Sequence, residues 1–443
     1  MSLAVLDLND HELGLYDNSG LIIASPGYVL AQGKQTVFGQ NAVQQSRLHP
    51  VSVNNEFWYR LGMTPLSRPL ANFRHYADIA YGHLLHLAEQ SDYKGDVVLS
   101  VPASFSREQL AILSGVIRHS PFKPVAMVDA ALASLLALPG LDQLVYVDLQ
   151  LHQLSLTRLT IKDEQVRRDA FITVSGAGWI HLANTIVQVV TDAFVTQSRF
   201  NPQHRADWEQ SLYNQLPDWL QQFKLGQSEI VAQIQTENSL VQARVSLNDV
   251  LEALGSAFHK ISQQLEQLMQ NQDAACDITL SARAAMIPGL QSCLQASVHS
   301  VPGEQLAMLC LQALPQSLSS SAEAIPMLTA LTLKVSAPVG IGATLQQPLK
   351  RQPTHLLWQA QAWPLPVAVK VDADGHCEIL ESSDDADVVF SIREKDGQAQ
   401  LLTRQPDIRV AGKLVNGSHP VYAGDNIRVG SPAVELHCIW VIS

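Results

Sequence analysis

The stretch LVYVDLQLHQLSLTRL, residues 144–159, decides the fold expected for the larger part of this chain. It opens as an apolar run, reaches Asp148, passes through a short polar turn and resumes as an alternating run with Leu154, Leu156 and Leu159. Apolar positions that recur every second residue are typical of strands with one buried face. The stretch therefore predicts a β-hairpin in which an aspartate follows the first strand.

The amino terminus repeats this pattern. LAVLDLNDHELGLYD, residues 3–17, is again an apolar strand, an aspartate (Asp7), a turn and a second strand. Two copies of one supersecondary unit indicate an internal repeat. We therefore expect two related halves that face a shared cleft.

Strands and helices alternate through the rest of this region. Helices are predicted at 68–91, 180–195, 201–226 and 247–269, and apolar strands at 125–128 and 169–174. Such alternation is typical of an α/β core.

The composition changes near Ala330. Beyond it, short alternating strands are separated by the turn signals Asp374-Gly375, Asp396-Gly397, Asn416-Gly417 and Gly424-Asp425. This pattern predicts an all-β sandwich or barrel. The Ser-rich stretch 316–326 resembles a linker, so we expect two domains, at 1–320 and 331–443, with the boundary within 315–335.

Charge and cysteine content limit the possible classes of protein. The net charge is −12 and Lys and Arg form no cluster, which argues against nucleic acid or an anionic membrane as partner. The five cysteines are scattered without a CxxC pair, which favours reduced thiols over a zinc site or disulfides. The most apolar run, 125–141, is interrupted by Asp129 and Pro139 and is too short to span a bilayer. Since the amino terminus also lacks a signal-peptide pattern, we expect a soluble cytoplasmic protein.

Several segments resemble the nucleotide-binding domain of the seventy-kilodalton heat-shock (DnaK-type) chaperones, in the actin/hexokinase superfamily. They are VFGQNAVQQSRLHPVSVNNEFWYRLG at 37–62, LSVPASFSREQLAIL at 99–113, the stretch around Asp129, and SLNDVLEAL at 246–254. The resemblance runs in unbroken order over residues 1–315. It implies a duplicated actin-like ATPase fold, with two lobes around a cleft, followed by the small all-β domain.

Members of this family hold ATP through glycine turns, because only glycine lets the backbone come so close to phosphate. Where the family has DLGTT, this chain has DLNDH at 7–11. Where the family has DLGGGT, it has DLQLHQ at 148–153, and where the family has GGxxRxP it has SARAAMIP at 281–288. The turn glycines are absent at all three sites.

The resemblance therefore implies a degenerate nucleotide cleft. Its members would be Asn9, Gln150, Ser281 and Arg283 at the former glycine turns, with Gly176 and Gly178 as the remnant of a further glycine turn. Asp10 would place a negative charge where a phosphate lies in the family, a repulsion on the order of 1–4 kcal/mol at ~4 Å.

Acidic residues remain at matching positions. Asp7 and Asp148 stand where the family's aspartates help to hold hydrated Mg²⁺, Asp129 stands where it has a cleft glutamate, and Arg60 lies near its catalytic lysine. Three converging acids would form a metal or general-base site if phosphate ligands existed. The alternative, that each aspartate starts a turn after a strand, is favoured. No metal site is expected.

The segment VAGKLVNGSHPVYAGDNIRVGS, residues 410–431, resembles the end of a forkhead-associated domain. That family binds phosphothreonine through Arg, Ser and His side chains, but ADVVFSIREKDG at 386–397 has no matching Ser-x-x-His. A generic sandwich with an Asn-Gly hairpin explains the residues equally well. A phosphopeptide site would need a basic concavity formed by Arg393, Arg404, Arg409 and Arg428.

These observations favour a non-catalytic relative of the chaperone/actin superfamily, a pseudo-ATPase that acts as a scaffold or protein-interaction module. Its partner would be another protein, and it would need no cofactor. The alternative is a divergent ATPase that uses ATP with Mg²⁺, through Asp7, Asp129 and Asp148 and with Arg60 or Arg283 as phosphate donors.

Overall fold

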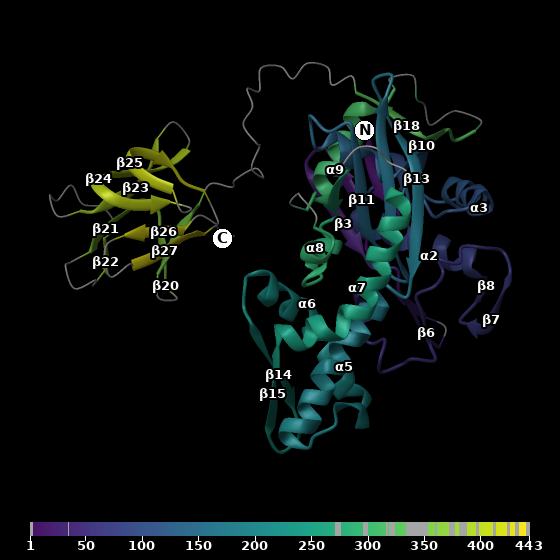
Figure 1. The fold of residues 1–443 in the computed structure, drawn as a ribbon, viewed down its shortest axis with the longest axis horizontal. Helices are drawn as coiled ribbons and strands as arrows, with labels where there is room; N and C mark the ends of the chain where they lie inside the picture. The colour runs from purple at the N-terminus through teal and green to yellow at the C-terminus, as the bar shows by residue number, and fades with distance from the viewer. Residues whose placement is uncertain are drawn as a thin grey trace. The chain divides into compact units, whose positions relative to one another are not determined.

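The computed structural model describes residues 3–439 except for 34, 271–275, 296–299, 316–317, 319–323, 334–352, 359–360, 372–376, 381–387, 396–397, 411–412, 423–425 and 430–433. The chain divides into two compact units, Met1–Ala337 and Pro338–Ser443 (Figure 1). The first unit is a mixture of helices and sheets, so the predicted α/β class is confirmed.

One large sheet of the first unit has six strands. They are β1 (Ala4–Asp7), β2 (Leu13–Asp17), β3 (Gly20–Ser25), β9 (Asp96–Val101), β10 (Lys123–Asp129) and β17 (Met327–Leu328). Their spatial order is β17-β10-β9-β1-β2-β3. Strands β1 to β3 form an antiparallel meander, whereas β9 runs parallel to β1 and β10 parallel to β9. The predicted amino-terminal hairpin is therefore confirmed, with its first strand inside the sheet.

The second large sheet has five strands, in the order β16-β11-β12-β13-β18. They are β11 (Gln143–Leu149), β12 (Gln153–Lys162), β13 (Gln165–Ser175), β16 (Asp277–Leu280) and β18 (Ala330–Thr332). Strands β11 to β13 again form an antiparallel meander, and β16 runs parallel to β11. The hairpin predicted from the central stretch is confirmed, and both sheets share this strand pattern.

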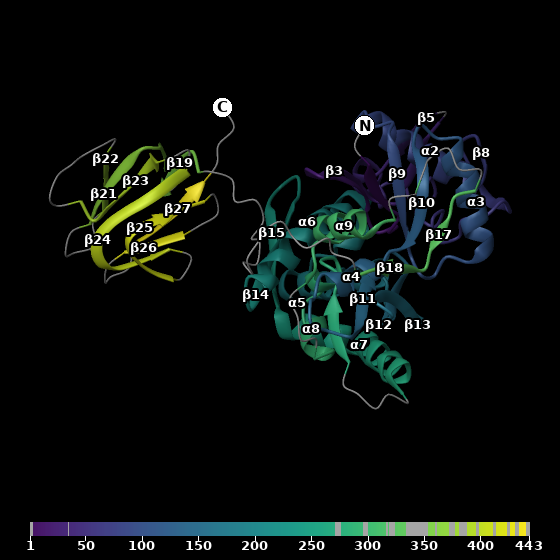
Figure 2. The same ribbon diagram turned by 90° about the horizontal axis from the view of Figure 1, so that it is seen from above.

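Helices pack against these sheets, as Figure 2 shows from above. The longer ones are α2 (Tyr76–Ser91), α3 (Arg107–Arg118), α5 (Trp179–Ser198), α6 (Ala206–Lys224), α7 (Leu247–Met269) and α9 (Gly303–Ala313). The short ones are α1 (Gln40–Val43), α4 (Leu132–Leu136), α8 (Leu290–Cys293), η1 (Pro202–His204) and η2 (Ala284–Met286). Apolar residues of α5, α6 and α7 share one core with β11 and β12. Within the described residues, no helix is long and apolar enough to cross a membrane.

Three smaller sheets complete the first unit. They consist of β4 (Val29–Gln32), β5 (Gln35–Phe38) and β6 (Val53–Asn54), of β7 (Pro65–Leu70) and β8 (Phe73–His75), and of β14 (Glu229–Gln235) and β15 (Leu240–Ser246). The prediction of one helix over 68–91 is wrong in its first part, since β7 and β8 occupy it and α2 begins at Tyr76. Ala71, in the turn between β7 and β8, has φ +47°, outside the right-handed helical region, and the His75 side chain caps α2 by accepting from the N–H of Asp78 at 3.2 Å.

The first unit extends beyond residue 320, the end that the sequence pattern predicted for the first domain. Strand β17 pairs in parallel with β10, and β18 pairs with β13 in the other sheet. The segment 327–332 thus adds one short strand to each large sheet. Strands of two and three residues are too short to show a period.

The second unit is all-β, with antiparallel strands in the order β20-β19-β27-β26-β24-β23-β21-β22 and with β25 beside β24. The strands are β19 (His355–Trp358), β20 (Gln361–Pro364), β21 (Val367–Val371), β22 (Cys377–Leu380), β23 (Phe390–Lys395), β24 (Gln398–Val410), β25 (Lys413–Pro420), β26 (Asn426–Val429) and β27 (Val434–Ile439).

The turn predicted at Asn416-Gly417 is wrong, because both residues lie inside β25. Gly417 has φ +82° and pairs with Thr403, where the register of β24 shifts. Glycine is suited to such an irregular position. The other three turn signals lie outside the described residues.

Candidate functional site

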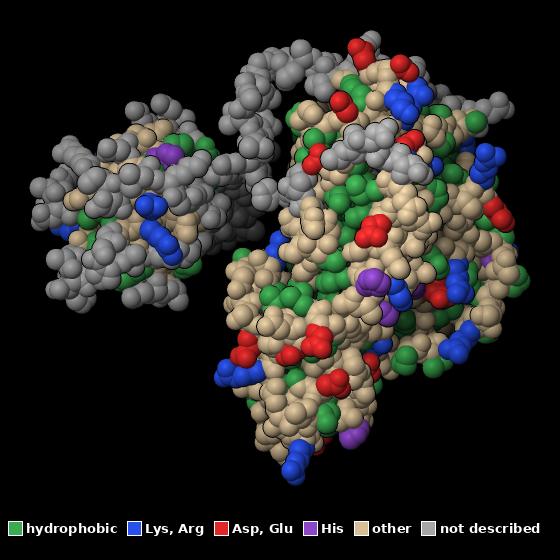
Figure 3. All heavy atoms as spheres, in the orientation of Figure 1, with side chains coloured by type: hydrophobic (Ala, Val, Ile, Leu, Met, Phe, Trp, Pro, Cys, Tyr) green, Lys and Arg blue, Asp and Glu red, His purple; other side chains and the backbone are tan. Residues whose placement is uncertain are grey.

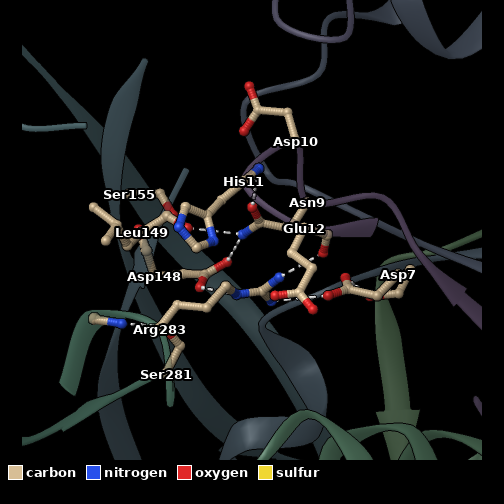
Figure 4. A network of polar contacts seen from close by, with 12 residues as sticks. Asp7, Asn9, Asp10, His11, Glu12, Asp148, Leu149, Ser155, Ser281 and Arg283 are labelled. Atoms are coloured by element: carbon tan, nitrogen blue, oxygen red, sulfur yellow. Dashed lines mark hydrogen bonds and ion pairs between the residues drawn. The ribbon is translucent and has the colours of Figure 1, made fainter. Parts of the chain in front are cut away.

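The turns that follow β1 and β11 are bonded directly to each other (Figure 4). The Asn9 amide donates to Oδ2 of Asp148 at 2.8 Å and to the carbonyl of Leu149 at 3.0 Å. The N–H of Leu151 donates to Oδ1 of Asp10 at 2.8 Å. The two turns predicted to face a ligand therefore bind each other, although Nδ1 of His11 and Oδ1 of Asp148 have no hydrogen-bond partner among the described residues.

Arg283 lies between the two strand-end aspartates. Its Nη2 donates to Oδ2 of Asp7 at 2.8 Å, and its Nε lies 3.6 Å from Oδ1 of Asp148. Its Nη1 donates to the carbonyl of Glu12 at 3.1 Å. The Arg283 side chain is only 19% exposed. The guanidinium thus joins both hairpins to the segment after β16.

The carboxylates and the guanidinium in this cluster stabilise each other's charged forms. Burial raises the pKa of Asp148, and the positive charge of Arg283 opposes that rise. Burial lowers the pKa of Arg283, but the carboxylates of Asp148 and Asp7 more than compensate, so its pKa is raised overall. Arg283 therefore stays protonated and supplies the positive charge that the two carboxylates need.

Little space remains where the three predicted acids meet. A cavity of about 30 Å³ is lined by Asp7, Asp129, Asp148 and Arg283, together with Tyr16 and Tyr146. Such a volume holds about two water molecules, whereas ligand pockets have about 300–1,000 Å³. The resemblance implied a triphosphate with Mg²⁺ at this place, and this cavity has about a tenth of the volume at the lower end of the range for ligand pockets.

Both carboxylate oxygens of Asp129 have partners within the protein. Its Oδ1 accepts from the N–H of Ala131 at 3.1 Å, and its Oδ2 forms an ion pair with Arg168 of β13. Burial raises the pKa of Asp129, and Arg168 opposes this shift. The bond to Ala131 is the local turn expected of an aspartate after a strand. Across the described residues, no group of three His, Cys, Asp or Glu side chains could hold a metal ion.

Of the two remnant glycines, Gly178 has a packing role. It precedes α5, and a Cβ at this position would lie 2.3 Å from the backbone nitrogen of Gln153. The next residue, Trp179, donates its N–H to the carbonyl of Gln150 at 2.8 Å. Gly178 therefore lets α5 begin directly against the second turn. Gly176 has φ +73°, a conformation that glycine adopts without strain.

The remaining predicted residues have different surroundings. Ser281 is buried, and its Oγ accepts from the N–H of Ala284 at 3.1 Å, which stabilises the turn that carries Arg283. Gln150 is buried in the second turn. Arg60 was predicted as a candidate residue of the cleft, and it does not line the cavity of the three acids. Its side chain is 57% exposed and lies 3.5 Å from Glu56.

A second set of contacts, which the sequence did not predict, joins the segment after α1 to α5 and α6. The guanidinium of Arg47 lies 3.8 Å from the ring centroid of Tyr213 and donates to Asn184 at 2.8 Å. The amide of Gln210 accepts from the N–H of Arg47 and donates to the carbonyl of Val43. These contacts connect a segment that precedes the second turn in sequence with two helices that follow that turn.

The arginines of the second unit are only partly described. Arg409 of β24 pairs with Arg428 of β26, and both are exposed. Arg393 lies on β23, and the side chain of Arg404 lies outside the described residues. In the first unit, the face shown in Figure 3 carries scattered charges of both signs and no basic patch of the kind that binds nucleic acid.

No protein-family model matches the chain, and no curated protein matches it significantly. Its function therefore has to be inferred from the geometry of its own residues.

Proposed function

We propose that the first unit is a duplicated, actin-like fold of the DnaK type that has lost ATP binding and hydrolysis. The shared strand pattern of the two large sheets supports the duplication. In this proposal the protein is a cytoplasmic scaffold or interaction module whose partner is another protein. The second unit, a forkhead-associated-like sandwich, provides a further contact surface.

The observation that carries this proposal is the ion-pair network of Arg283, Asp7 and Asp148. A phosphate group between the two turns would have to displace the guanidinium or approach two carboxylates. Breaking a buried ion pair by removing one partner costs about 3–5 kcal/mol. Asp10 also occupies the N–H of Leu151, a backbone donor of the kind that phosphate-binding turns offer to their ligand.

The test is calorimetric titration of the full chain with Mg-ATP. We expect no binding heat at millimolar nucleotide and no change in melting temperature. A micromolar binder at 1,000 times its Kd would add about 4 kcal/mol to the free energy of unfolding, which is readily measured. Micromolar binding of Mg-ATP would refute the proposal.

The second candidate is a divergent Mg-dependent ATPase, and one observation favours it. Asp7, Asp129 and Asp148 line the same small cavity, although they lie far apart in sequence. This candidate requires that wild-type protein hydrolyses ATP and that Asp148→Asn abolishes hydrolysis. A wild-type chain without activity in a sensitive phosphate-release assay would eliminate it.

A further inference from the structure

A larger cavity lies beside the same first turn. Its volume is about 280 Å³, close to the lower end of the range of about 300–1,000 Å³ for ligand pockets. Asp10 lines this cavity, and Figure 4 shows its carboxyl group directed away from the Arg283 network. The walls come from two parts of the first unit. The part before β11 contributes residues 8, 10, 58, 59, 102, 104, 105 and 109, and the part after it contributes Gln150, Gln153, Phe171 and Thr173.

Three buried side chains at this cavity have polar groups without a protein partner. Asp10, Gln150 and Gln153 are each at most 7% exposed. Oδ1 of Asp10 accepts from Leu151, and Nε2 of Gln153 donates to Oε1 of Gln150 at 2.8 Å. Within the described part of the chain, Oδ2 of Asp10, Oε1 of Gln153 and Nε2 of Gln150 make no hydrogen bond. The cavity therefore offers two acceptors and one donor to a ligand.

Aromatic rings form the rest of the walls. Trp58 is buried, whereas Tyr59 and Phe171 are 38% and 41% exposed, and Phe105 is half-buried. No Lys or Arg lines the cavity among the described residues. Outside the lining, Cζ of Arg168 lies 5.0 Å from the ring centroid of Phe171, and Arg168 forms an ion pair with Asp129.

We propose that this cavity binds the guanidinium group of an arginine side chain from a partner protein. The proposal rests on the protein-interaction function above and names the chemistry of the partner. A guanidinium is planar, donates five N–H groups and stacks on aromatic faces, which matches acceptors at the base and rings at the rim. An anion would approach the carboxylate of Asp10 in a cavity whose described lining has no Lys or Arg, and the net charge of −12 attracts basic partners.

The first test compares two capped peptides, acetyl-Gly-Arg-Gly-amide and its citrulline analogue, in titrations of the full chain followed by ligand-observed NMR. Citrulline keeps the shape of arginine but has no charge. We expect the citrulline peptide to bind at least tenfold more weakly. Equal affinities, or no binding of the arginine peptide at millimolar concentration, would overturn the proposal.

Two variants locate the binding site. Asp10→Asn removes the charge but keeps an acceptor for Leu151, and Phe171→Ala removes an exposed ring of the rim. Each is expected to weaken binding of the arginine peptide at least fivefold. The control is Asp163→Asn, which changes the net charge equally at an exposed turn between β12 and β13 and should leave affinity unchanged. If Asp10→Asn does not fold, the affinity of Phe171→Ala for the arginine peptide is the deciding measurement. Unchanged affinity in Phe171→Ala would then refute the site.

Two further results separate this proposal from its neighbours. Free arginine carries an extra ammonium and carboxylate, so it should bind more weakly than the peptide. Tighter binding of free arginine would show a metabolite site and overturn the partner assignment. Mg-ATP binding without effect on the arginine peptide would refute only the emptied cleft, whereas failure of the peptide titration would leave the emptied cleft intact.

Discussion

The two cavities beside the first turn differ in how their polar groups are satisfied. In the small cavity, Arg283 neutralises Asp7 and Asp148, and Asn9 occupies a carboxylate oxygen. In the large cavity, Asp10, Gln150 and Gln153 keep polar atoms without a protein partner, although each residue is at most 7% exposed. In the small cavity, Oδ1 of Asp148 likewise accepts no hydrogen bond among the described residues, and Nε of Arg283 lies 3.6 Å from it. The neighbouring residues Asn9 and Asp10 thus belong to two different environments.

This difference distinguishes polar groups that stabilise the fold from polar groups that are free to bind a ligand. Buried polar groups are normally paired, because an unpaired one costs about 1–3 kcal/mol. The ion pairs of Arg283 accordingly explain how the two hairpins are joined to the segment after β16. The unpaired set around Asp10 is explained if a ligand completes it.

The largest effect is expected from Arg283→Ala. This change leaves Asp7 and Asp148 buried without their cation, so the free energy of unfolding should fall by about 3–5 kcal/mol. Urea denaturation of the full chain measures this change, read from the transition in which the first unit unfolds. The matched control is Arg60→Ala, which removes an exposed arginine and should change stability by less than about 0.5 kcal/mol. Similar losses in the two variants would show that the network does not stabilise the contact between the two hairpins.

Acidification is expected to loosen the wall of the large cavity. His83 is fully buried, and its Nδ1 accepts from the indole N–H of Trp58 at 3.1 Å, while Ser25 contacts its Nε2. Burial, with a smaller contribution from the nearby His86, lowers the pKa of His83 to about 3. The unfolded chain binds this proton near pH 6.5, so the stabilising contribution is complete above pH 6.5 and is lost as the pH falls toward 3.

For this single group the loss between pH 8 and pH 5 is about 2 kcal/mol. Denaturation curves at both pH values should show it in the wild type, and His83→Asn should lack that part of the pH dependence. Equal pH dependence in wild type and variant would show that His83 is not held neutral. Fluorescence of Trp58 should change in the same pH range.

The sequence predicted the two hairpins that border the small cavity, because the signals for strands and turns are local in the sequence. The apolar runs before Asp7 and Asp148 have the period of strands, and each strand end places its aspartate in a turn. The resemblance indicated that the two turns and the turn of Arg283 would converge. The alternative hypothesis of a divergent ATPase used Arg283 as a phosphate donor, whereas the arginine pairs with the two aspartates of its own chain.

The large cavity could not be predicted in this way. Trp58, Phe105, Gln153 and Phe171 come from separate segments, and no spacing between them signals a shared site. Whether a buried amide has a partner depends on side-chain geometry that only the folded chain fixes. The contact of Arg47 with Tyr213 was missed for the same reason.

A smaller effect is expected where Arg47 contacts Tyr213. Because the guanidinium is partly exposed, the pair should contribute about 0.5–1 kcal/mol. A double-mutant cycle with Arg47→Ala and Tyr213→Leu isolates this coupling from the other contacts of each residue. A coupling near zero would show that the contact does not contribute to closing the region around the turns.

The smallest effect is expected from Asp10→Asn, which compares the two environments directly with Asp148→Asn. Burial raises the pKa of Asp10, although the N–H of Leu151 partly offsets this, so the charge on Asp10 disfavours folding at neutral pH. Asparagine keeps the acceptor and removes the charge, so stability should stay equal or rise by less than about 1 kcal/mol. Asp148→Asn should instead destabilise the protein, since Arg283 loses one of its two carboxylates. Denaturation midpoints that fall equally in the two variants would mean that Asp10 belongs to the structural network, and that its carboxylate is not reserved for a ligand.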